Sequence, residues 1–147
     1  MNGSSTTKAL VERFVAACNA DGSDPWQHLS PTVVVTIIGS TWFSGRFDGP
    51  EQIRRILIDT VRQYLRAPQI RITELIGEGQ DVAALIEVSG VTRTGQHFAI
   101  AGAPWGACFT MDAGRIVSID VFPDSMFVES TLCGAIYRPN DAARVLT

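Results

Sequence analysis

The stretch that decides the fold is residues 69–122, which read QIRITELIGEGQDVAALIEVSGVTRTGQHFAIAGAPWGACFTMDAGRIVSIDVF. Runs of apolar and β-branched residues in it predict four strands, at 69–78, 81–92, 96–111 and 114–122. The connections between these segments are only a few residues long and contain glycine. Because connections this short require neighbouring strands to run antiparallel, the stretch predicts an antiparallel meander.

Helical patterns come before this meander. Apolar residues recur at helical spacing over 9–18, and residues 24–29 are typical of a short capped helix. Residues 32–38 favour a further strand, and 48–66 predicts a longer helix that Pro68 ends. Helices gathered on one side of a curved antiparallel sheet define an α+β domain, and such a sheet can bend around a pocket.

The length of 147 residues suits a single domain over 1–147, with 1–7 as a flexible N-terminus and 135–147 as a C-terminal tail. The net charge of −3 argues against binding nucleic acid through the overall field of the protein. No apolar run is long enough to span a bilayer and the polar start has no apolar signal core. We therefore expect no nucleic acid or membrane partner, and a cytoplasmic location.

The cysteines and histidines do not form a recognisable metal or disulfide pattern. Cys18, Cys108 and Cys133 are an odd number and none belongs to a Cys-x-x-Cys pair. His28 and His97 lie far apart in the sequence. We expect buried, reduced thiols and no metal site.

Several motifs then carry a resemblance to a known family. They are FVAACNADG (14–22), FDGPEQIR (47–54), GRIV (114–117) and DVFPD (120–124). With them the chain resembles the nuclear transport factor two-like superfamily, most of all its branch of SnoaL-like polyketide cyclases, ketosteroid isomerases and limonene epoxide hydrolases. The resemblance implies a cone-shaped fold around a deep apolar pocket, a homodimer, a small hydrophobic substrate and no cofactor.

The catalytic residues of those relatives transfer only in part. Phe14 stands where the isomerases have a tyrosine, and Thr36 is the nearest match to their aspartate base. Glu87 matches one carboxylate of the epoxide hydrolases. Their second acid matches Asp120 or Val121, depending on whether a gap is allowed near the end of the last strand.

Glu87 is the first candidate for catalysis, because it stands in an otherwise apolar strand. Strand alternation places Leu85, Glu87 and Ser89 on one face, and Ala84 and its alternate neighbours on the other. Either face can line the pocket, and the resemblance favours the face of Glu87. A carboxylate among apolar walls has a raised pKa and can shuttle protons near neutral pH. The alternative is a half-exposed strand glutamate or one paired with an arginine.

Asp120 is the second candidate, again an acid within an apolar strand. Two carboxylates facing one pocket would split their pKa values, so that one donates and the other accepts a proton. The alternative is a charge at a strand end or sheet edge.

The remaining candidates would bind or orient the substrate. Thr36 and Ser89 offer hydroxyls that can orient an oxygen, with ordinary strand propensity as the alternative for Thr36. His97 is a possible acid–base group, although a surface histidine is favoured. The candidates for the apolar wall, with core or dimer packing as the alternative, are Phe14, Trp42, Ile100 and Trp105.

These residues together predict a cofactor-free acid–base enzyme of the isomerase, cyclase or dehydratase type. Its substrate would be a small hydrophobic molecule similar to a polyketide, terpenoid or steroid. The alternative is a module of the same fold that binds such a ligand, or dimerises, without turnover. A weaker alternative is an epoxide hydrolase.

Overall fold

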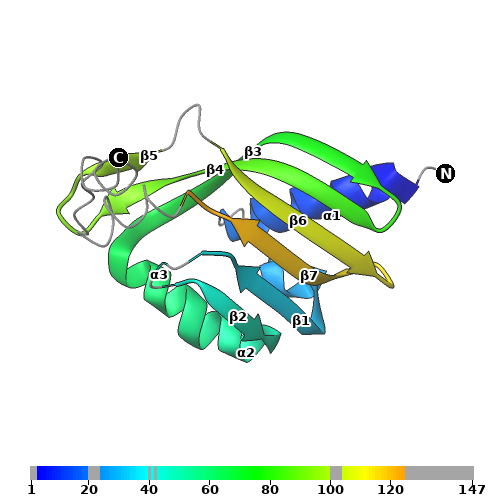
Figure 1. The fold of residues 1–147 in the computed structure, drawn as a ribbon, viewed down its shortest axis with the longest axis horizontal. Helices are drawn as coiled ribbons and strands as arrows, with labels where there is room; N and C mark the ends of the chain where they lie inside the picture. Colours follow the sequence, from blue (N-terminus) through cyan, green and yellow to red (C-terminus); the bar gives the residue numbers. More distant parts are fainter. Residues whose placement is uncertain (1–2, 20–23, 40, 42, 100–103, 125–147) are drawn as a thin grey trace, which may run out of the picture.

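The computed structural model describes residues 3–19, 24–39, 41, 43–99 and 104–124. In this part of the chain seven strands form one strongly curved sheet, and helices cover its inner face (Figure 1). The strands are β1 (Leu29–Ile37), β2 (Gly45–Asp48), β3 (Leu65–Glu78), β4 (Asp81–Thr92), β5 (His97–Ala99), β6 (Trp105–Asp112) and β7 (Arg115–Phe122).

The sheet has the strand order β2-β1-β7-β6-β4-β3, and β5 pairs with β4 beside this path. The β1–β7 pair is parallel, while the other paired strands of the described chain are antiparallel. The hairpin between β3 and β4 turns at Gly79, which has a φ of 61° that glycine adopts without strain. The α+β cone predicted from the sequence is therefore confirmed.

Two helical units enclose the inner side of the sheet. The first is α1 (Gly3–Cys18), which packs on β3 and β4 and lies behind the sheet in Figure 1. The second is a helical rod in which one helix continues directly into the next. It consists of α2 (Gly49–Gln52), the π-helical η2 (Ile53–Ile58) and α3 (Asp59–Tyr64).

A short 3₁₀ helix, η1 (Pro25–His28), leads into β1. The Asp24 carboxylate accepts a hydrogen bond of 3.0 Å from the backbone N–H of Trp26, which satisfies one free donor at the helix start. Pro25 occupies the first helical turn, where its missing N–H costs nothing. This confirms the short capped helix predicted at 24–29.

Several strand and helix boundaries differ from the predictions; for example, β1 spans Leu29–Ile37 and not 32–38. Pro68 does not end the helix: β3 begins at Leu65, and the chain passes the proline in a bulge where Ala67 has a φ of 49°. The predicted strand 96–111 is described as two separate strands, β5 and β6. Helix α1 starts at Gly3, inside the segment expected to be flexible.

The core lies between the inner face of the sheet and the two helical units. Val11 of α1, Val33 of β1 and Ile116 of β7 are completely buried there. Asn19, at the end of α1, joins the helix to β3 through its side-chain amide. Its Nδ2 donates to the carbonyl of Ile70 at 2.6 Å, and its Oδ1 accepts from the backbone N–H of Ile70 at 2.7 Å.

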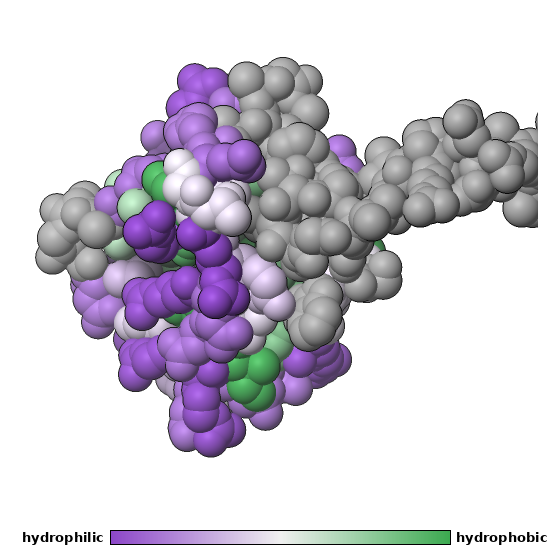
Figure 2. Space-filling view, turned by 90° about the vertical axis from the view of Figure 1, so that its left-hand side faces the viewer, coloured by the Kyte–Doolittle hydropathy of each residue, from purple (hydrophilic) through white to green (hydrophobic). Residues whose placement is uncertain are grey.

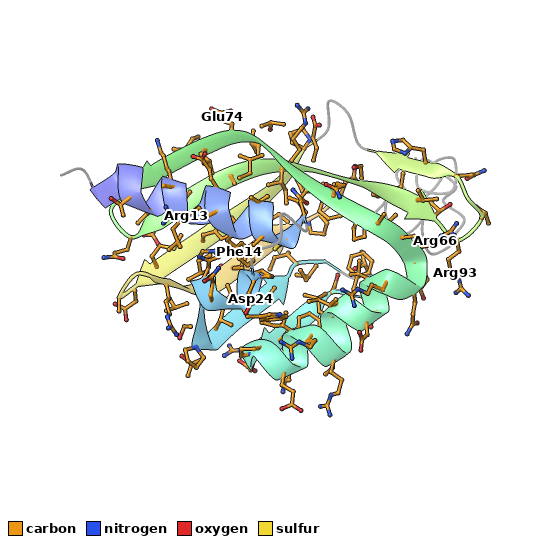
Figure 3. The ribbon with its side chains drawn as sticks, turned by 180° about the vertical axis from the view of Figure 1, so that it is seen from behind. Arg13, Phe14, Asp24, Arg66, Glu74 and Arg93 are labelled. Carbon is orange, nitrogen blue, oxygen red and sulfur yellow. The ribbon has the colours of Figure 1, made fainter. Side chains whose placement is uncertain are left out.

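The end of the molecule at which α3 turns into β3 is largely hydrophilic where the described residues are visible (Figure 2). The charged side chains Arg66 and Arg93 lie toward this end, and Glu74 projects from the outer side of β3 (Figure 3). The apolar side chains are instead gathered inside the curve of the sheet.

Candidate ligand-binding cavity

An apolar cavity of about 240 Å³ lies between α1, the helical rod and the inner face of the sheet. Every strand that contributes to it does so with alternate residues, as the pleat requires. The described residues that line it are Phe14, Val15, Cys18, Pro25, Trp26, Leu29, Val35, Ile37, Ile53, Leu57, Ile58, Ile70, Ile86, Ala107, Phe109, Ile119 and Val121.

Phe14 lies in the wall of this cavity, on the side of α1 that faces the sheet (Figure 3). Its ring meets that of Phe109 from β6 edge-to-face, with centroids 6.3 Å apart and the planes at 70°. The preceding residue, Arg13, is exposed. The helical spacing that predicted an apolar stripe on α1 thus placed Phe14 correctly.

No acid, base, amide or hydroxyl side chain is among these lining residues. The only sulfur is the thiol of Cys18, at the end of α1. Burial raises the pKa of this thiol to about 12, because the thiolate would lose its hydration. Cys18 is therefore a neutral thiol near pH 7, neither a base nor an activated nucleophile.

Cys18 and Cys108 are both free thiols, and both residues are partly accessible to solvent. The expectation of a buried thiol is wrong for Cys108, while Cys133 lies outside the described residues. Cys108 is exposed because it projects from the outer face of β6, beside Asp120 of β7. The thiol of Cys18 is desolvated although the residue is accessible, because it lies against the apolar cavity wall.

Glu87 lies on the outer face of the sheet, opposite to the face that lines the cavity. Ile86, its neighbour in β4, lines the cavity instead. The Arg71 guanidinium donates to Glu87 Oε2 from Nη2 at 2.6 Å and from Nε at 3.2 Å. The predicted orientation of Leu85, Glu87 and Ser89 toward the pocket is therefore wrong, and the arginine-paired glutamate is what the structure contains.

The alternation of β4 sets the orientation of Glu87, and the register between β3 and β4 explains why an arginine stands opposite it. Near the hairpin Glu74 pairs with Leu85, but beyond a shift at Thr73 it is Arg71 that pairs with Glu87. The extra residue, Thr73, inverts the alternation of β3. As a result Ile72 faces the same side as its partner Ile86, and the charged pair faces outward.

Asp120 also lies on the outer face. The sequence left open whether Asp120 or Val121 takes the place of the second acid, and in the structure it is Val121 that lines the cavity. Ile116 and Ile119 are both buried although they are three positions apart, an odd spacing that simple strand alternation would place on opposite faces. A register shift between Thr110 and Met111 of the partner strand β6 accounts for this spacing. The bulge turns Asp120 outward, where its partners in register are Thr36 and Cys108.

Thr36 consequently shares the outer face with Asp120, because the two are paired in the parallel β1–β7 ladder. Val35 and Ile37 of β1 line the cavity on either side of Thr36 in the sequence. His97 is exposed, whereas the following residue, Phe98, is 1% exposed. Trp42 and Ile100 lie outside the described residues.

Trp105 lies on the inner face, 8% exposed, in the wall of a second, smaller cavity of about 60 Å³. The other described residues that line this cavity are Phe43, Val61, Tyr64, Leu65, Val88 and Phe98. The prediction that Trp105 turns inward is thus in agreement with its position.

Sequence reasoning did not identify Trp26 as part of the cavity wall. Its ring lines the cavity and lies under the guanidinium of Arg54, whose Cζ is 4.7 Å from the ring centroid. The two come from η1 and η2, which only the folded chain brings together. A signal was present in the sequence, because Asp24 and Pro25 define a helix start directly before this tryptophan.

The chain belongs to the SnoaL-like family: the model of the SnoaL-like domain matches residues 11–119. That range covers the helices and strands that enclose the cavity. Solved structures of the nuclear transport factor two-like fold are similar over most of the chain. No curated protein sequence matches it.

Three solved structures illustrate this similarity. A proposed SnoaL-like polyketide cyclase from Jannaschia sp. CCS1 has a TM-score of 0.74 at 17% identity, covering 92% of this chain and 97% of its own. AclR from Streptomyces galilaeus, a proposed hydroxylase, has a TM-score of 0.66 at 19% identity, covering 95% and 88%. TerC, co-crystallised with polyporic acid, has a TM-score of 0.75 at 14% identity, covering 88% and 99%. At these identities the similarity establishes the fold alone.

Within the described residues, no helix is long and apolar enough to cross a membrane. The same residues contain no group of three or more His, Cys, Asp or Glu side chains arranged to hold a metal ion.

Proposed function

We propose that the protein binds a small, largely apolar molecule in the cavity between α1, the helical rod and the sheet. The observation that carries this proposal is a wall of hydrocarbon side chains around about 240 Å³. Removing apolar surface of a ligand from water contributes roughly 25 cal/mol per Å², which favours occupancy of such a space. TerC, which shares the fold, was crystallised with polyporic acid, and this also supports a ligand here.

The cavity volume favours a compact ligand within the classes expected from the sequence. Ligand sites usually enclose ~300–1,000 Å³, and this cavity of about 240 Å³ is below that range. A one- or two-ring molecule of polyketide or terpenoid type therefore suits the space better than a steroid. The absence of a charged group among the described lining residues favours an uncharged ligand.

Turnover of such a molecule by an isomerase, cyclase or dehydratase is the second candidate function. The family and the proposed activities of structures with the same fold support it. The orientation of Glu87 and Asp120 does not support turnover, because their sequence neighbours Ile86 and Val121 line the described cavity in their place. Binding without turnover by these two acids is therefore the function that the geometry supports best.

A matched pair of alanine substitutions tests the binding proposal. Ala107 is 2% exposed and lines the cavity, whereas Ala83 lies on the outer face, adjacent in register to Cys108. We expect Ala107→Leu to weaken binding of α-tetralone, a bicyclic ketone, at least about tenfold, because the added atoms occupy the ligand space. Ala83→Leu should leave the affinity unchanged. Isothermal titration calorimetry measures both.

The outcomes separate the candidate functions. Equal weakening by Ala83→Leu and Ala107→Leu, or no binding to the wild type, would contradict ligand binding in this cavity. Incubation of the protein with the same ketone, followed by mass spectrometry, tests for turnover. Product that disappears in both Glu87→Gln and Asp120→Asn would instead favour the acid–base enzyme.

The homodimer expected from the resemblance stays a proposal. Exposed apolar side chains on the outer face of the sheet support it: Leu85 is 38% and Phe122 is 47% exposed. Both are paired with Gly106, which lies between them in the sheet. A second copy placed on this face would cover them.

A further inference from the structure

Trp105 has a hydrogen-bond donor that the described protein does not use. Its Nε1 atom is buried and has no hydrogen-bond partner. Native proteins seldom leave a buried N–H unsatisfied, because the group then loses its hydrogen bonds to water without forming one to the protein. An unpaired donor in a cavity wall therefore points to an acceptor that occupies the cavity.

The cavity that Trp105 lines is large enough to hold such an acceptor. Its volume of about 60 Å³ has room for a few non-hydrogen atoms. Its other described lining residues are apolar apart from Tyr64. An oxygen placed here would find the indole N–H as a donor within an apolar surrounding, where a hydrogen bond is electrostatically stronger than in water.

This smaller cavity lies next to the main one along the same inner face of the sheet. Ile86 and Ala107 line the main cavity, and each is two residues from a wall of the smaller one, Val88 on β4 and Trp105 on β6. Two residues span about 7 Å along a strand. On the helical rod Ile58 lines the main cavity and Val61, three residues further on, lines the smaller one. A ligand that extends from the main cavity past these side chains would meet Trp105 with one end.

We propose that the Trp105 Nε1–H donates a hydrogen bond to a carbonyl oxygen of the ligand and so selects apolar ketones over hydrocarbons of the same shape. This inference rests on the proposed binding function. A carbonyl only accepts, so it brings no donor that would itself need a partner. A carboxylate is a poor fit, because no cationic side chain is among the described residues that line either cavity.

The test compares α-tetralone with tetralin, which has the same two rings but no carbonyl. The measured quantity is the ratio of the two affinities, because it cancels the loss of ring packing. We expect Trp105→Phe, which keeps an aromatic ring and removes the donor, to lower the ketone-to-hydrocarbon ratio about fivefold. Trp26→Phe, which removes an indole N–H elsewhere in the wall, should change the affinities for both probes alike and keep the ratio.

A spectroscopic readout accompanies the affinities. The Nε1–H resonance of Trp105, assigned by its loss in Trp105→Phe, should move downfield when α-tetralone binds and much less with tetralin. An unchanged ratio in Trp105→Phe, or the same shift with both probes, would overturn the assignment while leaving ligand binding intact. A water held by the indole would give this second result. If neither probe binds the wild type, the binding function itself fails and the donor role of Trp105 fails with it.

Discussion

Arg71 and Glu87 lie directly opposite each other on β3 and β4, joined by a 2.6 Å hydrogen bond between Nη2 and Oε2. Their side chains are 72% and 20% exposed, so the pair belongs to the outer surface of the sheet. Opposite charges across a strand pair stabilise that register modestly. With the carboxylate held outward by its partner, the adjacent Ile86 lines the cavity.

The first prediction concerns this ion pair. Glu87→Gln should change the free energy of unfolding by less than about 1 kcal/mol, because exposed ion pairs contribute little. Binding of α-tetralone should be unchanged, since Glu87 is not in the cavity wall. Urea denaturation and calorimetry measure the two effects. A large loss of ligand affinity in Glu87→Gln would show that the carboxylate reaches the ligand.

The second prediction concerns Gly90 in β4, which packs against Leu65. A Cβ atom at Gly90 would lie 2.6 Å from Leu65 Cγ and 3.0 Å from the Arg66 carbonyl oxygen. We expect Gly90→Ala to destabilise the protein by about 1–3 kcal/mol, because the side chain cannot be accommodated without moving the backbone.

The control for Gly90 is Gly106, a strand glycine on the outer face. A Cβ there would meet Phe122 at an ordinary 3.8 Å. Gly106→Ala should be neutral or slightly stabilising, since alanine loses less backbone entropy on folding. Equal free energies of unfolding for the two variants would contradict the close packing of Gly90 on Leu65.

The third prediction concerns Asn19, which joins α1 to the cavity wall at Ile70. Asn19→Ala should cost about 1–3 kcal/mol of stability, because it leaves both the N–H and the carbonyl of Ile70 unpaired in a partly buried place. Thr73→Val, which removes one exposed hydrogen bond of 3.2 Å to the Leu85 carbonyl, should cost much less. Urea titrations compare the free energies of unfolding of the two variants. A similar loss in both would contradict a stabilising role for the Asn19–Ile70 hydrogen bonds.

The fourth prediction follows from the Cys18 thiol, whose pKa burial raises from 9.0 to about 12. Between these values the unfolded chain loses the thiol proton while the folded chain keeps it. The free energy of unfolding therefore falls as pH rises from about 9 to about 12. The stabilisation that comes from the raised pKa of Cys18 is fully present below pH 9. Partial solvent access makes the loss smaller than for a sealed thiol.

Cys18→Ala isolates this contribution. With rising pH from about 9 to about 12, the free energy of unfolding of the wild type should fall relative to that of Cys18→Ala. Urea denaturation across this range measures it. A pH-independent difference for Cys18→Ala would mean that the thiol is not desolvated.

The fifth prediction tests the proposed homodimer. Phe122→Lys should shift the equilibrium toward monomer, because it places a charge in the apolar area shared with Leu85. Ile56→Lys, at a 45% exposed position on the helical rod, should not. Sedimentation equilibrium at micromolar concentration gives the masses. A wild type that sediments as a monomer under these conditions would exclude the dimer.

Much of the fold could be predicted from local patterns. Strand β4 begins at Asp81 and ends at Thr92 as expected, because its alternation is uninterrupted and turns bound it on both sides. The apolar stripe of α1 placed Phe14 in the cavity wall, because helical spacing holds for the whole length of an unbroken helix. The resemblance implied an apolar pocket, and the described lining is apolar, although the sequence also predicted carboxylates in it.

The candidate site could not be predicted in the same way, because its polarity depends on which face of each strand is inside. One additional residue in a strand exchanges the two faces beyond it, since side chains alternate with a period of two. Thr73 of β3 and Val117 of β7 are such additional residues. Val117 turns Asp120 outward and leaves Val121 in the cavity. The uninterrupted alternation of β4 directs Glu87 outward, and Thr73 places Arg71 opposite it.

Local sequence therefore determined the helices and strands, their order and the apolar character of the interior, since these depend on neighbours within a few positions. Tertiary structure alone decided which side chains meet a ligand. Bulges arise where paired strands must match their apolar faces around a strongly curved sheet, and that match involves residues distant in the chain. That the indole N–H of Trp105 is buried without a partner follows only from the tertiary structure, because residues from several elements surround it.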